Sequence, residues 1–270
     1  MNLTDIFKNG LKYPTNNWVN LIILGVILLI ITLIGQARAY TNNGIIIGVI
    51  AIISVILGII VSGYKIDIIK KGVEGSDEIP LLSPENFITG IKSIIVSIVY
   101  YIIPAIIIII VGFLTGAIAG IGELGKYFNA EVISAISTNP NLINQTIAQV
   151  PPSLFTNLFT AAAITAIIAA ILFFIFSILA FIAQGKLAET DSLSAAISFG
   201  DILNKVGSIG WAKIIAYLIL LFIILLVIGF ISALICIIPI IGVIIAGLII
   251  SPFILLFQYY SLGLLYASDE

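Results

Sequence analysis

The sequence has no histidine, one cysteine and few charged residues, which make up 9% of its 270 positions. Without histidine, the chain lacks the commonest general base and the commonest metal ligand of proteins. The single Cys236 excludes an intrachain disulfide and a thiolate cluster for a metal. A formal net charge of −2 with no basic run excludes the clustered cations that nucleic-acid binding needs. We therefore expect no nucleic-acid partner.

Hydrophobic residues account for 61% of the chain, and the mean hydropathy is +1.29. Apolar runs long enough to cross the hydrocarbon of a bilayer recur along the sequence. The pattern predicts an all-α integral membrane protein, a single polytopic domain over residues 1–270 with about six transmembrane helices and short amphipathic interfacial helices. The expected spans are residues 19–35, 44–62, 93–120, 155–183, 211–235 and 242–266, with inner loops 63–92 and 184–210 and an outer loop 121–154.

Amphipathic segments flank the spans. In residues 1–17, Leu3, Ile6 and Phe7 share one face, which predicts a helix lying on the membrane surface. We expect one or two further surface helices in residues 123–154, and another in the loop 184–210, where Leu193, Ala196, Ile197 and Gly200 share a face.

Residues 37–39 (Ala-Arg-Ala) also have the small-x-small form of a signal-peptidase site after an apolar core. Retention of the first 39 residues and their cleavage both stay open. The intact mass of the purified protein distinguishes them.

Small residues recur at four-residue spacing in two of the spans, so that they stack on one helix face and allow another helix to approach closely. We expect these two faces to pack against each other, with a dimer contact as the alternative. They consist of Ser54, Gly58 and Ser62 in span two and of Gly112, Gly116 and Gly120 in span three.

Proline marks several expected helix boundaries. Ser83-Pro84-Glu85 predicts a helix start, in which Ser83 caps and proline takes the first helical position. The following apolar stretch is too long for a straight span, and Pro104 is the expected kink. A turn near residues 236–242, around Pro239, separates span five from span six. The pair Ser251-Pro252 predicts a bend in span six.

The basic residues are divided unequally between the two sides of the membrane that six spans would define. The outer side holds only Arg38 and Lys126, so the positive-inside rule predicts a protein of the cell (plasma) membrane with both termini cytoplasmic. The nine basic residues of the inner side are Lys8, Lys12, Lys65, Lys70, Lys71, Lys92, Lys186, Lys205 and Lys213.

Apart from Lys213 at the edge of the fifth expected span, no charged residue falls inside the expected spans, which disfavours a proton relay, a voltage sensor or an intramembrane protease. Serines within the spans have no neighbouring base to activate them, and we expect their hydroxyls to bond to the helix backbone. We expect no catalytic, cofactor-binding or metal-binding residue and predict that the protein is not an enzyme.

Acidic residues of the first inner loop carry oxygen ligands suited to a divalent cation. They lack the fixed spacing of a calcium loop and lie among lysines, so a solvated, partly ion-paired loop is favoured. These residues are Glu74, Asp77, Glu78 and Glu85.

The order of several short motifs resembles a known family. The motifs are Lys12-Tyr13-Pro14, Trp18, Gly63-Tyr64, Gly72 to Pro80, Phe87-x2-Gly90-x-Lys92, Pro239-x2-Gly242 and Ser251-Pro252-Phe253. Together, from about residue 5 to residue 267, they resemble the largely archaeal family of polytopic membrane proteins catalogued as domain of unknown function 4013. The resemblance implies a multi-span membrane protein and brings no reaction, ligand or site residue with it. It favours retention of the N-terminal segment.

Three functions follow as hypotheses. The favoured one is a non-enzymatic scaffold or accessory subunit of a membrane complex, which contacts the lipid bilayer and binds a membrane or cytoplasmic protein through loops 63–92 and 184–210. The alternative is a transporter or channel for a small neutral or apolar solute, with a polar cavity lined by Tyr100, Tyr101, Gln258 and Tyr259. A sensor working through residues 123–154 is the third.

Overall fold

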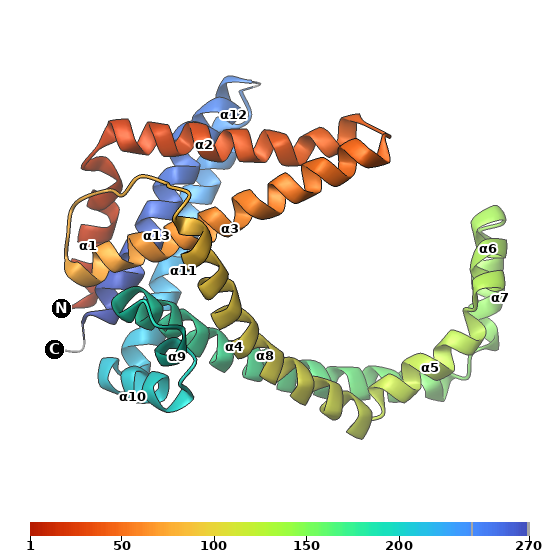
Figure 1. The fold of residues 1–270 in the computed structure, drawn as a ribbon. Coiled ribbons are helices and arrows are strands. Elements are labelled where there is room, and N and C mark those ends of the chain that lie inside the picture. The colour runs from red at the N-terminus through yellow and green to blue at the C-terminus, as the bar shows by residue number, and fades with distance from the viewer. Residues whose placement is uncertain (239, 269–270) are drawn as a thin grey trace. The chain divides into compact units, whose positions relative to one another are not determined.

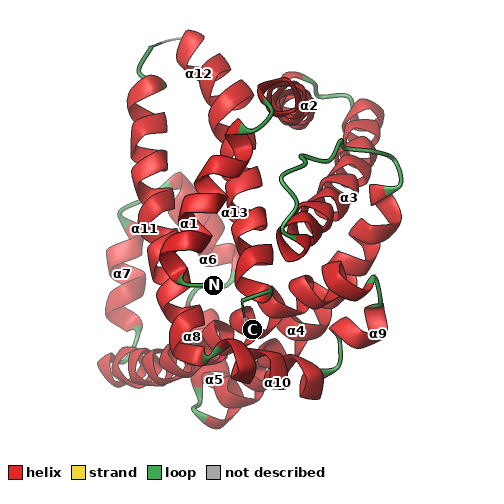
Figure 2. Cartoon of the chain, turned by 90° about the vertical axis from the view of Figure 1, so that its left-hand side faces the viewer, coloured by secondary structure: helices red, strands yellow, loops and turns green. Residues whose placement is uncertain are grey.

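The structure, a computed structural model, describes residues 1–238 and 240–268 as helices joined by turns and loops (Figures 1 and 2). The elements in chain order are α1 (Leu3–Lys12), η1 (Tyr13–Thr15), α2 (Trp18–Gln36), η2 (Ala37–Tyr40), α3 (Gly44–Glu74), α4 (Asn86–Leu114), α5 (Ala117–Tyr127), α6 (Ala130–Thr138), α7 (Leu142–Gln149), α8 (Pro152–Thr190), α9 (Leu193–Ala196), α10 (Phe199–Ile209), α11 (Trp211–Ile235), α12 (Ile241–Ile245), η3 (Ala246–Ile250) and α13 (Ser251–Tyr266).

Six helices in the described residues are long and apolar enough to cross a membrane: α2, α3, α4, α8, α11 and the stretch Ile241–Tyr266. This confirms the all-α fold with about six spans. Two of them exceed the expected spans, since α3 continues to Glu74 and α8 to Thr190. Each extension keeps a buried apolar face, so both inner loops begin as helix.

The chain forms two compact units. Unit 1 consists of Met1–Ile98 with Ile178–Glu270, and unit 2 consists of Val99–Ser177. Helices α4 and α8 contribute residues to both. The single polytopic domain stays a prediction.

Helix α13 is the central element of unit 1, and it is in contact with α1, α2 and α3. The apolar face of α1 packs onto it: Ile6 and Phe7 are buried, and the Phe7 ring lies 6.2 Å from the Phe257 ring of α13. The amphipathic helix predicted near the N-terminus therefore exists, with its apolar face against protein. The buried residues of α13 are Pro252, Leu256, Phe257, Tyr260, Ser261, Leu262, Gly263, Leu264, Leu265 and Tyr266.

Glycines set the closest helix crossings of unit 1. A Cβ added at Gly63 of α3 would overlap the carbonyl oxygen of Asn86, and one at Gly90 of α4 would overlap that of Ile59. The same holds where Gly72 of α3 meets α13 at Gly263. Backbones this close leave no room for a side chain, so these positions require glycine.

The predicted packing of small residues is wrong in its details. A Cβ at Gly58 would meet no atom within 4 Å, and close packing on α3 occurs at Gly63 and Gly72 instead. In unit 2, Gly120 faces the Leu158 side chain, and Gly116 adopts a positive φ of 82° that ends the preceding helix. Four-residue spacing identified a helix face but not its contacts.

The start of α4 also differs from the prediction. The helix begins at Asn86 after a turn, and the Ser83 backbone N–H donates to Oδ1 of Asn86 at 2.8 Å. Asn86, rather than Ser83, supplies the polar side chain at this turn. The helix then runs through Pro104 to Leu114, and Gly116 limits its length.

Span six is irregular next to the position of its predicted bend, and the bend itself stays a prediction. A π-helical segment, η3, directly precedes Ser251-Pro252, and the Ser251 hydroxyl donates to the Ala246 carbonyl at 3.0 Å. Proline has no N–H to donate, so the α-helical pattern is interrupted there. The turn predicted around Pro239 centres on a residue outside those described.

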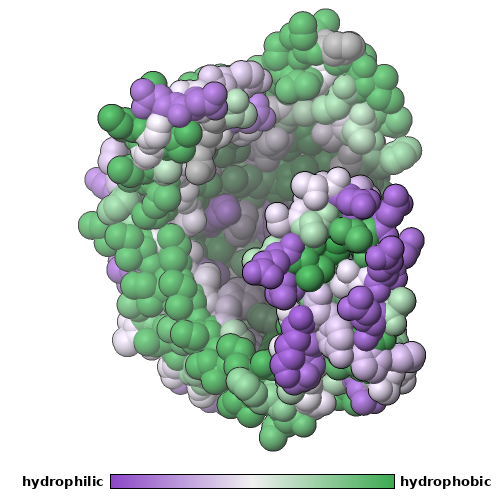
Figure 3. All heavy atoms as spheres, turned by 90° about the vertical axis from the view of Figure 1, so that its right-hand side faces the viewer, coloured by the Kyte–Doolittle hydropathy of each residue, from purple (hydrophilic) through white to green (hydrophobic). Residues whose placement is uncertain are grey.

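Short helices occupy both predicted surface regions. Residues 117–149 hold α5, α6 and α7, more helices than expected, and residues 193–209 divide into α9 and α10 rather than forming one helix. Apolar side chains cover much of the face in Figure 3, with hydrophilic side chains gathered in patches.

Candidate functional site

Four polar segments of unit 1 meet at one surface, which we call the polar cap: residues 1–17, 63–92, 184–213 and 266–268. They carry nine of the 11 basic residues of the chain. Three contacts join them. Lys92 pairs with Asp191 at 2.8 Å, the Tyr13 hydroxyl donates to the Glu78 carbonyl at 2.7 Å, and Lys213 donates to the Ser268 carbonyl at 2.7 Å. The two loops that were predicted to share the inner side are thus in direct contact.

A second tie between the loops lies beside the first. Gln184 of α8 accepts a hydrogen bond from the Ser93 hydroxyl at 2.9 Å and donates to the Ser93 carbonyl at 3.0 Å and the Ser97 hydroxyl at 3.1 Å. The amide is fully used, which fixes α8 against α4 where the cap begins. The sequence interpretation missed Gln184, whose signal is an amide at the end of a long apolar run.

The loop after α3 is held by its backbone. Three successive carbonyls, those of Glu78, Ile79 and Pro80, each accept a hydrogen bond from a side chain of a different element. The bonds come from the Tyr13 hydroxyl of η1 at 2.7 Å, the Asn20 amide of α2 at 3.1 Å and the Tyr64 hydroxyl of α3 at 2.9 Å. We call this arrangement the carbonyl clamp.

Tyr13 is the best-buried donor of the clamp, with no exposed surface. Its ring lies parallel to that of Tyr260, with 3.7 Å between centroids. Burial raises the pKa of the Tyr13 hydroxyl, and the neighbouring Tyr64 and Tyr260 act in the same direction. Tyr13 therefore stays protonated and remains a donor throughout the physiological range.

Charged residues of the loop remain outside the clamp. Glu78 forms an ion pair with Lys71 at 2.8 Å, and this hydrogen bond lowers the pKa of the Glu78 carboxyl. Glu74, Asp77 and Glu85 are exposed. Among residues 1–238 and 240–268, no group of three or more His, Cys, Asp or Glu side chains is placed to hold a metal ion.

Asn86 is 2% exposed and connects α3 to the start of α4. Its amide donates to Asp67 of α3, and its carbonyl oxygen accepts from Ser83. The Asp67 carboxylate thus accepts a hydrogen bond from the start of the next helix. Local helix spacing could not reveal a partner 19 residues away.

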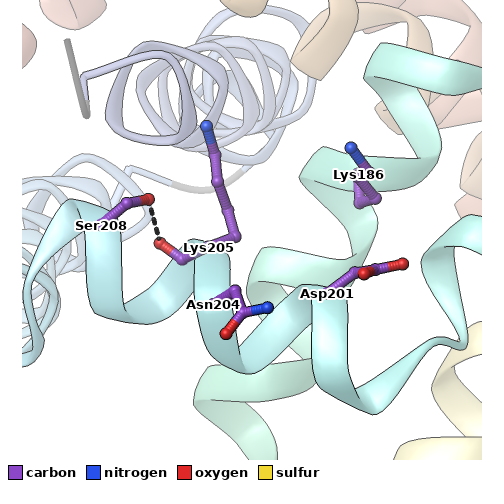
Figure 4. A pocket seen from close by; sticks show the side chains of 5 residues that line it. All are labelled: Lys186, Asp201, Asn204, Lys205 and Ser208. Atoms are coloured by element: carbon purple, nitrogen blue, oxygen red, sulfur yellow. Dashed lines mark hydrogen bonds between the residues drawn. The ribbon is translucent and has the colours of Figure 1, made fainter.

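The second inner segment contains a compact polar network. Lys186 donates to Oε2 of Glu189 at 2.9 Å, and the Tyr266 hydroxyl donates to the same oxygen at 2.8 Å. The Lys205 ammonium lies 4.3 Å from the centre of the Tyr266 ring. Beside this network lies an open hollow of about 520 Å³, lined by Lys186, Asp201, Asn204, Lys205 and Ser208 (Figure 4).

Unit 2 has polar pairs of its own between α4 and α8. The Thr115 and Thr165 hydroxyls are 2.8 Å apart, and the Tyr101 hydroxyl lies 3.4 Å from that of Ser177. Next to the first pair is a hollow of about 410 Å³ without a charged lining residue. It is lined by Thr115, Gly116, Gly120, Leu154, Asn157, Leu158, Thr160, Ala161 and Ile164.

The residues of the predicted solute cavity divide between the units. Tyr100 and Tyr101 belong to unit 2, whereas Gln258 and Tyr259 belong to unit 1. Tyr259 lies beneath the Lys65 ammonium at 5.2 Å. The hollows described above are lined by other residues.

Two serines of the spans bond to the helix backbone, as expected. The hydroxyls of Ser54 and Ser97 donate to the carbonyls of Ile50 and Ser93, one helical turn back. Each hydroxyl proton is donated to a backbone carbonyl, and no neighbouring base is required to account for these serines.

Six apolar helices of spanning length, an apolar surface and a polar cap define an all-α, multi-pass membrane protein. Within that class, the chain belongs to the DUF4013 family, described as a protein of unknown function, whose sequence signature matches residues 46–237. The match runs from α3 to just beyond α11 and is shorter than the stretch on which the resemblance was based. No curated protein and no solved structure matches the chain.

Proposed function

We propose that the protein is a non-enzymatic scaffold or accessory subunit of a membrane complex that binds a protein partner through its polar cap. The supporting observation is the joining of loops 63–92 and 184–210 by the Lys92–Asp191 ion pair. Two segments far apart in sequence thereby present one surface before a partner arrives. Ordering a surface in advance reduces the entropy cost of binding.

The charges of the cap suit recognition of another polar protein surface. Exposed acidic residues Glu74, Asp77 and Glu85 follow the exposed Lys70 on the first loop, and Asp201 is exposed on α10. Mixed charges of this kind favour specificity and register over affinity. The proposed partner is therefore a membrane or cytoplasmic protein with a complementary pattern of charge.

Photocrosslinking in native membranes tests the scaffold proposal. A photoreactive amino acid at Asp77 or Asn204 should yield a discrete heavier adduct containing a second protein. The matched control is Glu131 of α6, which is exposed and lies outside the cap. Adducts of the same pattern from all three positions, or none from the cap positions, would contradict the proposal.

We also infer that the protein lies in the cell (plasma) membrane with the cap and both termini in the cytoplasm, because nine of the 11 basic residues lie in the cap. In a Cys236→Ser background, a membrane-impermeant thiol reagent should label Ser134→Cys, but not Glu74→Cys, on intact cells. Labelling of Glu74→Cys on intact cells would show that the cap faces the outside and would contradict the inferred orientation.

A second candidate function is a transporter or channel for a small neutral solute. The uncharged hollow beside the Thr115–Thr165 pair supports it, because its hydroxyl groups suit a solute without charge. Proteoliposomes should then release glycerol faster than protein-free vesicles, and Gly120→Leu, which fills the hollow, should abolish the difference. Equal release with and without protein would remove this candidate.

A further inference from the structure

The hollow beside α10 is lined by polar residues alone, in a chain that is 61% hydrophobic. Lys186 reaches it from α8, and Asp201, Asn204, Lys205 and Ser208 reach it from α10 (Figure 4). Residues 201, 204, 205 and 208 are spaced by three and four, so they share one helix face. The opposite face of α10 is apolar and buried through Ile202, Val206 and Ile209.

Both lysines that line the hollow are in contact with residues that do not line it. Glu189 accepts from Lys186 and from the Tyr266 hydroxyl through the same carboxylate oxygen, and the Tyr266 ring lies under the Lys205 ammonium. Tyr266 is 1% exposed, so the arrangement rests on a fixed ring. Two cations positioned in this way favour binding of an anionic group without further ordering.

The charges around the hollow balance. Lys186 and Lys205 provide two positive charges, and Glu189 and Asp201 provide two negative ones. Asp201 would repel a multiply charged anion, and the two lysines would repel a simple cation. A ligand that carries one charge of each sign fits both, with Asn204 and Ser208 as further hydrogen-bonding groups.

An exposed tryptophan follows the helix that lines the hollow. Trp211 is 40% exposed and starts α11, only three residues after Ser208. Tryptophan at the end of a transmembrane helix is typical of the depth at which lipid headgroups lie. The position of the hollow therefore favours a ligand attached to the bilayer.

We propose that this hollow binds the headgroup of a phosphoethanolamine lipid, with the phosphate at Lys186 and Lys205 and the ammonium at Asp201. The primary ammonium matters because it donates hydrogen bonds to a carboxylate, whereas the trimethylated ammonium of phosphocholine does not. The proposal concerns a lipid rather than a protein partner and is independent of the proposed scaffold function.

Native mass spectrometry of the purified full chain tests the proposal. The protein is titrated with phosphatidylethanolamine, phosphatidylcholine, phosphatidylglycerol and diacylglycerol of matched acyl chains. We expect phosphatidylethanolamine to be retained about fivefold more than the other three, as one hydrogen bond of ordinary net strength would give. Equal retention of all four lipids would overturn the proposal.

Two variants and a control assign the binding to the hollow. Asp201→Asn, at an exposed position, should bring the ratio of phosphatidylethanolamine to phosphatidylcholine close to one, and Lys186→Gln should weaken both. Lys70→Gln removes an exposed lysine outside the hollow and should bind as the wild type does. If Asp201→Asn keeps the wild-type ratio, the assignment of the ammonium to Asp201 is wrong.

A soluble competitor identifies the source of the headgroup. Millimolar O-phosphoethanolamine that displaces the lipid would show that the headgroup alone carries the recognition. Failure to displace it, with the fivefold preference intact, would assign binding to the membrane-attached form.

Discussion

Lys92 donates to two oxygens of Asp191 at once, the main-chain carbonyl at 2.9 Å and the side-chain carboxylate at 2.8 Å. Asp191 follows the last residue of α8 and adopts a positive φ of 51°. Aspartate and asparagine tolerate this left-handed conformation better than most residues. A single lysine thus joins two segments that lie 99 residues apart in the sequence. One of its two hydrogen bonds goes to the main chain of Asp191 and therefore depends on the backbone conformation there.

Substitutions at Asp191 should separate charge from conformation. Asp191→Asn keeps a residue that tolerates positive φ but loses the ion pair, which at this exposed site is worth about 0–1 kcal/mol. Asp191→Ala adds left-handed strain of roughly 1 kcal/mol. Thermal unfolding in detergent should therefore rank wild type first, asparagine second and alanine last. Equal melting temperatures for asparagine and alanine would show that the backbone conformation carries no cost.

Removing a donor of the carbonyl clamp should loosen the loop without unfolding the protein. Tyr64→Phe deletes the hydrogen bond to the Pro80 carbonyl and retains the ring, at a cost of about 1 kcal/mol. Hydrogen exchange of residues 76–85 should rise about fivefold, following that free energy. Tyr40→Phe is the control, because Tyr40 is 88% exposed. A rise of the same size in Tyr40→Phe would show that the faster exchange does not come from loss of the clamp hydrogen bond.

Glycine positions on a single helix should respond in opposite ways. Gly63→Ala places a methyl group on the backbone of α4, and we expect a loss of about 1–3 kcal/mol or failure to fold. Gly58→Ala, five residues earlier on α3, meets open space and should be neutral or slightly stabilising. Fluorescence-detected size exclusion after heating compares the two. Comparable losses at both positions would contradict the described crossing.

The Lys71–Glu78 pair should make the loop sensitive to acid. The hydrogen bond and charge of Lys71 lower the pKa of Glu78 below its usual 4.5. A carboxyl with a lower pKa in the folded chain stabilises the fold above its unfolded pKa, and this contribution disappears as the pH falls through the folded pKa. Hydrogen exchange of residues 76–85, corrected for intrinsic rates, should therefore rise as the pH falls from 6 to 3.5.

Two variants serve as controls for the acid response. Glu78→Gln should remove the dependence, because the glutamine does not titrate. Glu74→Gln changes a neighbouring exposed carboxyl and should retain it. An unchanged response in Glu78→Gln would assign the sensitivity to another group.

The spanning helices and their number followed from the sequence because long uncharged runs have few alternatives in a bilayer. The contacts between helices did not follow in the same way. Gly58 and Gly63 are both small residues on α3, but only the second meets another backbone. Spacing along one helix defines a face, whereas the neighbour of that face depends on tertiary structure. For the same reason, Ser83 was taken as the cap at a turn where Asn86 supplies the side chain.

The polar cap was foreseeable in outline and not in its connections. The lysine counts predicted that loops 63–92 and 184–210 lie on one side of the membrane, but not that they touch. Besides the Lys92–Asp191 pair, the side chains that hold these loops include Gln184, Asn20 and Tyr266, which are uncharged and lie within or beside apolar runs. Their signal in the sequence is weak, because each bonds to a residue far away along the chain.

The three clamped carbonyls have a consequence for how the loop can vary. Every amino acid has a carbonyl, so the path of residues 78–80 depends on Tyr13, Asn20 and Tyr64 rather than on the side chains of the loop itself. Shape and surface chemistry are thereby specified by different residues. A new charge or aromatic group can be introduced at the exposed position 77 while the main chain keeps its course, so this loop is a suitable place to engineer a changed binding preference.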